Sequence, residues 1–118
     1  MFSESIIKQV WDKGIAVDGY DKNLYRKDAA GAWIAFNMYG NKESVLGWEI
    51  DHVWPKAKGG DDNMDNLRPL NWRNNESKGD DYPVYKTAIV AEENKNVLKV
   101  TERTINENLQ IRLKELYG

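Results

Sequence analysis

Near the N-terminus, apolar and polar residues alternate with the period of a helix. The segment from Ser3 to Lys13 has apolar residues at i, i+1, i+4 and i+5, which share one helix face: Ile6, Ile7, Val10 and Trp11. Ser3 or Ser5 is suited to cap this helix, and Gly14 predicts where it ends. We predict an amphipathic helix whose apolar face packs in the core; the alternative use of that face is to bind a partner.

The segments that follow carry weaker patterns. Ile15 to Asp28 is polar with scattered apolar anchors, which predicts a loop. Ala29 to Phe36 is small and apolar, which predicts a strand from which Trp33 and Ile34 enter the core. Tyr39 to Asn41 contains a glycine and an asparagine and predicts a turn.

The C-terminal third has a strand pattern and then a helix pattern. Tyr85 to Ala91 and Val97 to Thr104 are rich in β-branched residues, and the polar segment from Glu92 to Asn96 separates them, which predicts a β-hairpin. Thr104 and Glu107 fit a capping box for a short helix. One face of that helix carries leucines, which we expect to pack in the core or to form a homodimer contact: Leu109, Leu113 and Leu116.

The central stretch, from Trp48 to Gly79, combines several signals in a fixed order. A short apolar run ends in Asp51 and His52, and His52 is the only histidine of the chain. A polar loop with two adjacent glycines follows, and Asn66 then opens the sequence Asn-Leu-Arg-Pro-Leu. The last part is helix-like, with several asparagines and a lysine. A single Asp-His pair means little, but this ordered set is hard to obtain by chance.

These residues, in this order, resemble the ββα-metal core of HNH endonucleases, the His-Me finger nucleases. The family motif is an Asp-His pair, an Asn before an apolar residue, and a His or Asn on the helix; here these are Asp51-His52, Asn66 and Asn75. The likeness to small, zinc-free bacterial members extends over roughly 10–80. It implies an α+β fold, with the ββα-metal core at residues 47–80, an N-terminal helix, and a C-terminal β-hairpin plus short helix, in one domain covering 1–118.

The motif residues have the chemistry that phosphodiester hydrolysis needs. A neutral imidazole can take a proton from water near neutral pH, so His52 is the predicted general base. A hard divalent cation offsets phosphate charge and prefers oxygen ligands, for which we predict Asp51 and Asn75. By resemblance, Asn66 braces the loop after His52. The resemblance also implies Mg²⁺, Mn²⁺ or a similar ion, and products with 5′-phosphate and 3′-hydroxyl ends.

The geometry of a strand restricts this site. Neighbouring strand residues point to opposite faces, so the strand that carries Asp51 and His52 must end, bend or bulge there, and Val53 to Pro55 fits such a break. On the helix, Asn71, Asn75 and Lys78 share a face. Asn71 is a departure, because relatives often have histidine there. If that histidine assists the site, activity is in doubt; if it caps the helix, asparagine serves equally well.

Basic residues around the motif are candidate contacts for nucleic-acid phosphates: Lys78, Arg73, Arg68, Lys56, Lys58, Arg26 and Lys27. Acidic residues nearly cancel them, the formal net charge is −2, and the pI is about 5.4. Because phosphate neutralisation supplies most non-specific affinity, this balance argues against tight, indiscriminate DNA binding. We predict a narrow groove that relies on the metal, with double-stranded DNA as the partner.

Composition sets the remaining expectations. The 118 residues, 41% hydrophobic, suit one compact domain. The chain has no cysteine, which excludes disulfides and thiolate zinc sites, so we expect no structural zinc. No apolar run approaches transmembrane length, and we expect a cytoplasmic protein that does not bind membranes.

The sequence favours a metal-dependent DNA endonuclease and leaves rival interpretations open. The first is a catalytically inactive HNH-fold module that binds nucleic acid or another partner, which the acidic balance and Asn71 motivate. The second is a nuclease acting as a toxin, with a separate acidic inhibitor. The sequence does not distinguish DNA from RNA.

Overall fold

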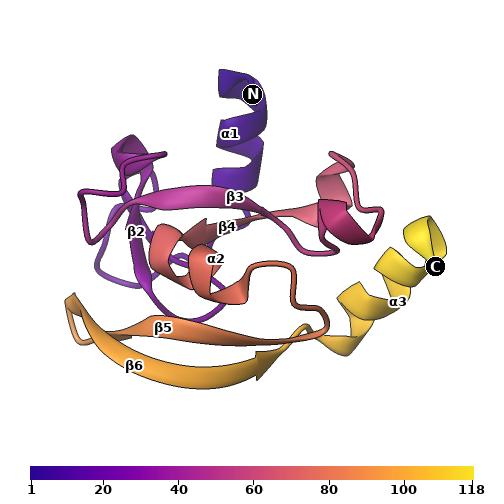
Figure 1. Cartoon of the computed structure of the whole chain (residues 1–118). Helices are drawn as coiled ribbons and strands as arrows, with labels where there is room; N and C mark the ends of the chain where they lie inside the picture. The colour runs from indigo at the N-terminus through magenta and orange to yellow at the C-terminus, as the bar shows by residue number, and fades with distance from the viewer.

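A computed structural model describes all residues, 1–118, as a mixed α+β chain (Figure 1). The three helices are α1 (Glu4–Trp11), α2 (Trp72–Lys78) and α3 (Glu107–Tyr117). The strands form three antiparallel pairs: β1 (Tyr25–Lys27) with β2 (Trp33–Ala35), β3 (Trp48–His52) with β4 (Leu67–Asn71), and β5 (Val84–Glu92) with β6 (Lys95–Thr104). Three single 3₁₀ turns lie between them: η1 (Phe36–Met38), η2 (Lys56–Lys58) and η3 (Met64–Asn66).

The layers follow from which faces are apolar. Figure 1 shows α2 between the β3–β4 pair and the β5–β6 hairpin, while α1 approaches β3 and β4 from the other side. Hydrogen bonds fix α2 on the hairpin: the side-chain oxygen of Asn74 accepts from the backbone N–H groups of Ala88 and Ile89, at 2.9 and 3.0 Å. None of the helices is long and apolar enough to cross a bilayer.

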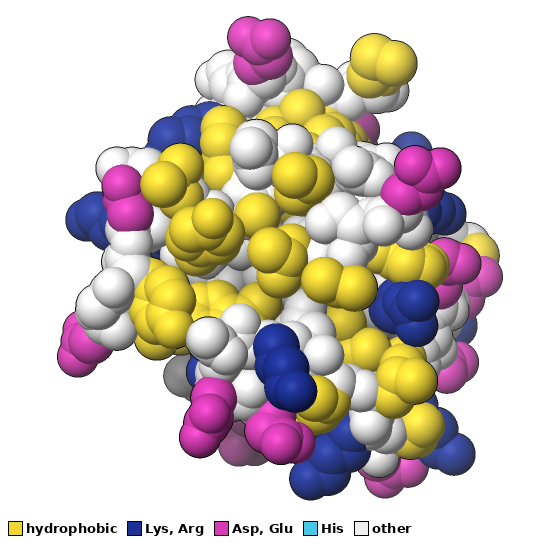
Figure 2. Space-filling view, turned by 90° about the vertical axis from the view of Figure 1, so that its left-hand side faces the viewer, with side chains coloured by type: hydrophobic (Ala, Val, Ile, Leu, Met, Phe, Trp, Pro, Cys, Tyr) yellow, Lys and Arg dark blue, Asp and Glu magenta, His cyan; other side chains and the backbone are white.

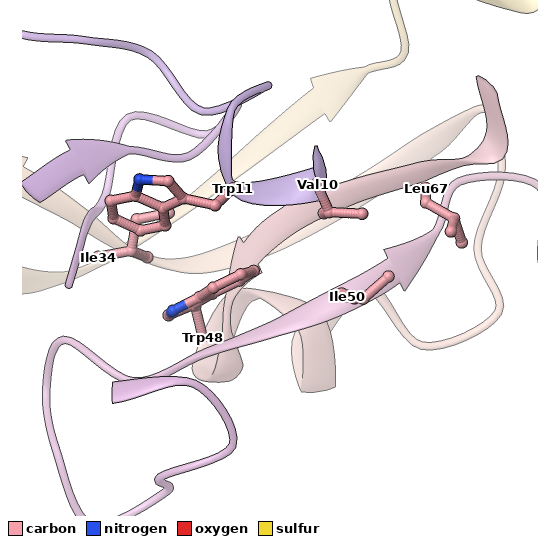
Figure 3. Packing of buried hydrophobic residues seen from close by; sticks show 6 residues of the cluster. All are labelled: Val10, Trp11, Ile34, Trp48, Ile50 and Leu67. Atoms are coloured by element: carbon pink, nitrogen blue, oxygen red, sulfur yellow. The ribbon is translucent and has the colours of Figure 1, made fainter. Parts of the chain in front are cut away.

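The N-terminal helix forms as predicted. Ser3 is the N-cap, and its hydroxyl accepts from the Ile6 N–H at 3.2 Å. The apolar face packs on the β3–β4 pair in a cluster of six buried residues (Figure 3): Val10, Trp11, Ile34, Trp48, Ile50 and Leu67. The Trp11 and Trp48 rings lie 5.3 Å apart between centroids. The helix ends at Trp11 with Asp12 as its C-cap, ahead of the glycine expected to end it.

The segment expected to be a loop contains a short strand. Tyr25–Lys27 forms β1, which pairs with β2, and Lys27 also bridges to Ile15. Its side chains are polar and do not predict a strand, because the pairing depends on β2. In β2, Trp33 and Ile34 are buried as predicted. A loop was therefore the wrong prediction for Tyr25–Lys27.

A buried carboxylate links this strand pair to α2. The oxygens of Asp28 accept from the backbone N–H groups of Ala30, Ala32 and Asn71 and from the side-chain amide of Asn74, at 2.8–3.1 Å. Burial raises the pKa of Asp28 above its ordinary value, and these four donors oppose the rise. Because Asn71 and Asn74 belong to the start of α2, the network fixes where that helix begins.

The predicted C-terminal hairpin and helix are both present. The β5–β6 turn is tighter than expected, with only Glu93 and Asn94 between the strands, and Glu93 has a positive φ of 55°. The leucine face of α3 packs on a second cluster of buried residues: Val53, Tyr85, Ile105 and Leu113.

The capping box predicted at Thr104 and Glu107 is wrong. Thr104 is the last residue of β6, and the N-cap of α3 is Asn106, whose side chain accepts from the Leu109 N–H at 2.8 Å. We expect Asn106→Ala to lower the free energy of unfolding by about 1 kcal/mol, because it removes this cap. Thr104→Ala, on the exposed edge, is the matched control and should change it by less than about 0.5 kcal/mol. Urea denaturation compares the two, and equal losses would contradict the assignment of the cap.

Candidate active site

The motif residues lie on a continuous strand, strand and helix unit, β3, β4 and α2. The β3–β4 register puts Asp51 opposite Arg68 and His52 opposite Leu67. The strand β3 ends at His52, and the Val53 N–H still donates to the Asn66 carbonyl at 2.9 Å. The regular pairing thus runs through Asp51 and His52 without a bulge, and β3 ends at His52.

Three predicted site residues line one hollow of about 160 Å³. Asp51 and His52 line it as neighbouring residues of β3, and Asn75 lines it as a residue of α2. Its complete lining is Ile50, Asp51, His52, Pro55, Lys56, Asn75, Gly79 and Asp80. The hollow is thus small and is lined mostly by polar residues.

Asp51 is held between two cations, the largely buried Arg68 and the fully buried Lys78. Its Oδ2 accepts from Nε of Arg68 at 2.9 Å, and its Oδ1 lies 3.3 Å from Nζ of Lys78. Only 4% of the Asp51 side chain is exposed, and none of the Lys78 side chain is. Burial lowers the pKa of Lys78 below its ordinary value, which Asp51 opposes by favouring the charged ammonium. Both carboxylate oxygens therefore have fixed positions.

His52 points in the direction opposite to Asp51, as neighbouring strand residues do. Its Nε2 lies 2.7 Å from Oδ1 of Asp62, in the loop between β3 and β4. The Phe2 ring lies beside the imidazole, with 6.0 Å between the ring centroids. His52 is thus partly covered, and one of its two nitrogens has a partner.

Asn75 is oriented by a neighbouring strand residue. Its Nδ2 donates to Oε1 of Glu49 at 3.0 Å. Glu49 lies two residues before Asp51 and so faces the same side of β3. With the amide nitrogen occupied in this way, Oδ1 of Asn75 has no partner within the protein and is free to bind a ligand.

Asn66 has the contacts of a brace. Its side chain is fully buried, accepts from the Trp54 N–H at 2.7 Å, and donates to the carbonyls of Trp54 and Asp61, each at 3.1 Å. These bonds join the two ends of the loop that follows His52. Asn66 does not itself line the hollow.

Asn71 lies away from the hollow. It is buried at the end of β4, caps α2 by accepting from the Arg73 N–H at 3.0 Å, and donates to the carbonyls of Trp33 and Val45. Its geometry is that of a helix cap, the second of the two roles considered for this position. The predicted common face of Asn71, Asn75 and Lys78 is wrong, because the strand β4 includes Asn71 and the helix starts only at Trp72.

Three of the predicted phosphate contacts have partners inside the protein. Lys78 and Arg68 are counter-ions of Asp51, and Arg68 also lies over the Tyr85 ring, 5.0 Å from its centroid. Arg26 donates to the carbonyls of Lys22, Asp12 and Gly14 and so ties β1 to the end of α1. Each of these three cations is already paired with a group inside the protein. The order of residues in the sequence does not reveal these pairings.

The other basic candidates lie nearer the surface. Lys56 is exposed and is the one of them that lines the hollow, and Lys58 is exposed two residues further along. Lys27 lies over the Trp33 ring at 5.0 Å and Arg73 over the Trp72 ring at 4.9 Å, and neither lines the hollow.

Two partners of the candidate site residues were not predicted from the sequence. Asp62 contacts His52, and nothing in the sequence pattern pairs the two residues. Glu49 had one signal, its i−2 spacing from Asp51 on a strand, which puts the two side chains on one face. No sequence pattern predicted the contacts between charged residues that lie far apart in the chain.

Hydrophobic side chains gather on a different face, at the side where β2 and the tip of the β5–β6 hairpin lie (Figure 2). A hollow of about 350 Å³ has lining residues from three segments: Tyr20, Tyr25, Trp33, Leu46 and Asn94. It shares no residue with the hollow at Asp51 and His52.

The β3–β4–α2 unit carries the Asp, His and Asn residues of the sequence motif. A family model described as HNH endonuclease matches residues 35–84, which contain the whole unit. Over this segment the chain is similar to the HNH endonuclease family. Comparisons with curated proteins and with solved structures gave no match.

Proposed function

We propose that this protein is a metal-dependent endonuclease that hydrolyses DNA phosphodiester bonds, with β3, β4 and α2 as its ββα-metal core. The observation that supports it most is the single hollow lined by Asp51, His52 and Asn75, inside the segment that matches the HNH family. A general base and two oxygen donors at one polar surface are what such a reaction requires.

His52 is the proposed base. A neutral imidazole at the hollow accepts a proton from a water molecule, and the water oxygen bonds to phosphorus as the bond from phosphorus to O3′ breaks. The leaving O3′ takes a proton from solvent, which gives a 3′-hydroxyl and a 5′-phosphate end. The partial cover over the ring limits its movement, so its accepting nitrogen stays directed.

Asp51 and Asn75 fit a hard cation such as Mg²⁺ or Mn²⁺. The free Oδ1 of Asn75 is a neutral oxygen donor, and each Asp51 oxygen, although paired, has a further lone pair. Mg²⁺ is commonly held by one or two side-chain oxygens together with water and substrate phosphate, which suits so small a donor set. Bound there, the ion would supply positive charge for the phosphate.

Lys56 is the proposed phosphate contact at the hollow, with Lys58 beside it on the exposed η2 turn. Arg68 and Lys78 are paired with Asp51. The further positive charge that offsets the phosphate would therefore have to come from the metal. Cleavage by this protein should therefore depend steeply on the divalent ion.

A plasmid assay tests the function. We expect purified protein to convert supercoiled DNA to nicked and linear forms with Mg²⁺ or Mn²⁺, and excess EDTA to abolish this conversion. Asn75→Ala should lower the apparent affinity for the metal by about 10–100-fold. Cleavage that persists in EDTA would contradict the metal dependence. DNA binding without cleavage under any metal would instead support an inactive HNH-fold binding module.

A further inference from the structure

The contact between His52 and Asp62 has no part in the function proposed above. The two groups are 2.7 Å apart, and 18% of the His52 side chain and 60% of the Asp62 side chain are exposed. Asp62 is not among the residues that line the hollow with Asp51 and Asn75. The contact therefore forms beside the hollow and leaves the hollow itself free.

The direction of this hydrogen bond follows from the chemistry of the two groups. The bond from His52 lowers the pKa of Asp62 below its ordinary value, so the carboxylate is ionised near neutral pH. An ionised carboxylate can only accept, and Nε2 of His52 must then carry the hydrogen. A neutral imidazole has one N–H, so the lone pair that accepts a proton lies on Nδ1.

The loop that carries Asp62 is held at the residue before it. The Asn66 side chain donates to the Asp61 carbonyl at 3.1 Å, and the Tyr117 hydroxyl of α3 donates to the Asp61 carboxylate. The Phe2 ring covers part of the imidazole. These contacts restrict the carboxylate and the ring relative to each other, as an orienting hydrogen bond requires.

We propose that Asp62 is a positioning residue that fixes His52 as the Nε2–H tautomer, so that Nδ1 is the nitrogen that accepts the proton from water. The carboxylate would also stabilise the imidazolium that this transfer forms. The second half of this inference rests on the proposed nuclease function. The tautomer itself is a property of the protein without substrate or metal.

The tautomer can be measured directly, because the chain has one histidine. In metal-free ¹⁵N-labelled protein, at a pH where the ring is neutral, we expect Nε2 to show the shift of a protonated nitrogen and Nδ1 that of an unprotonated one. In Asp62→Asn the amide can either accept from Nε2 or donate to it, so the two shifts should move toward each other. Asp18→Asn, the same change at an exposed residue, should leave them unchanged. Wild-type shifts in Asp62→Asn would overturn the proposal.

Cleavage kinetics provide the second measurement. Asp62→Asn should lower kcat by about 10–100-fold with little change in KM, and Asp62→Glu should recover part of the loss. Because Asp62 acts through the ring, Asp62→Asn should cost nothing further in a His52→Ala background. A wild-type kcat for Asp62→Asn would overturn the positioning role while leaving the nuclease function intact. If the wild type cleaves nothing, the nuclease function fails, and the ¹⁵N shifts alone decide whether Asp62 sets the tautomer.

Discussion

His52→Ala should reduce the rate of metal-dependent plasmid cleavage by about 10²–10⁴-fold, the usual contribution of a general base. His52 is the last residue of β3 and lines the hollow, and no other histidine exists to replace it. Single-turnover rates of DNA nicking, at saturating Mn²⁺ or Mg²⁺, give the measurement.

Chemical rescue distinguishes a base from a structural residue. Alanine leaves space where the ring was, so free imidazole added to His52→Ala should restore part of the rate, while it should not affect Asn75→Ala. Circular dichroism and Mn²⁺ titration of the variant check that folding and metal binding persist. A rate within a few-fold of wild type, or a loss that imidazole never restores in a folded variant, would argue against His52 as the base.

Asp51→Ala should lower the free energy of unfolding by about 3–5 kcal/mol, apart from any effect on metal binding. Asp51 is the one carboxylate between Arg68 and Lys78, and the Lys78 side chain has no exposed surface. Removing the anion leaves two cations in a low-dielectric interior. Since a domain of this size has a total stability of about 5–15 kcal/mol, much of it would be lost.

Urea denaturation of metal-free protein tests this prediction, and two variants control it. Asn75→Ala removes the other proposed metal ligand but touches no buried charge, so it should cost much less. Adding Lys78→Met to Asp51→Asn removes one of the stranded cations and should return part of the stability, a coupling that a double-mutant cycle quantifies. If Asp51→Ala and Asn75→Ala cost the same, the buried ion cluster contributes little.

The sequence predicted those parts of the fold in which local pattern and packing agree. The stripe of α1 matches its buried face, and Tyr85, Thr87 and Ile89 give β5 a buried face, whereas β6 has no buried residue. The cap of α3 was misplaced because Asn106 and Thr104 are both good capping residues, and the choice depends on where the β6 ladder stops. The strand β1 was missed because β2 determines its pairing.

The candidate site also has residues that the sequence predicts and residues that it does not. Asp51, His52 and Asn75 could be proposed because their types and spacing carry the chemistry, and the fold brings them to one hollow. The basic residues could not be sorted in the same way, because a lysine on the surface and Lys78 in the interior look alike in a sequence. What separates them is the partner, and the partners of Lys78 and Arg26 come from other strands and loops.

The contacts of Phe2 with His52 and of Tyr117 with Asp61 have a practical consequence for anyone who expresses this protein. An affinity tag fused at either end would emerge beside the loop that holds Asp62, and could crowd it. A polyhistidine tag would add imidazoles that chelate divalent ions, and their ¹⁵N signals would obscure those of the His52 ring. Cleavable tags without histidine, removed before assay, suit this chain better.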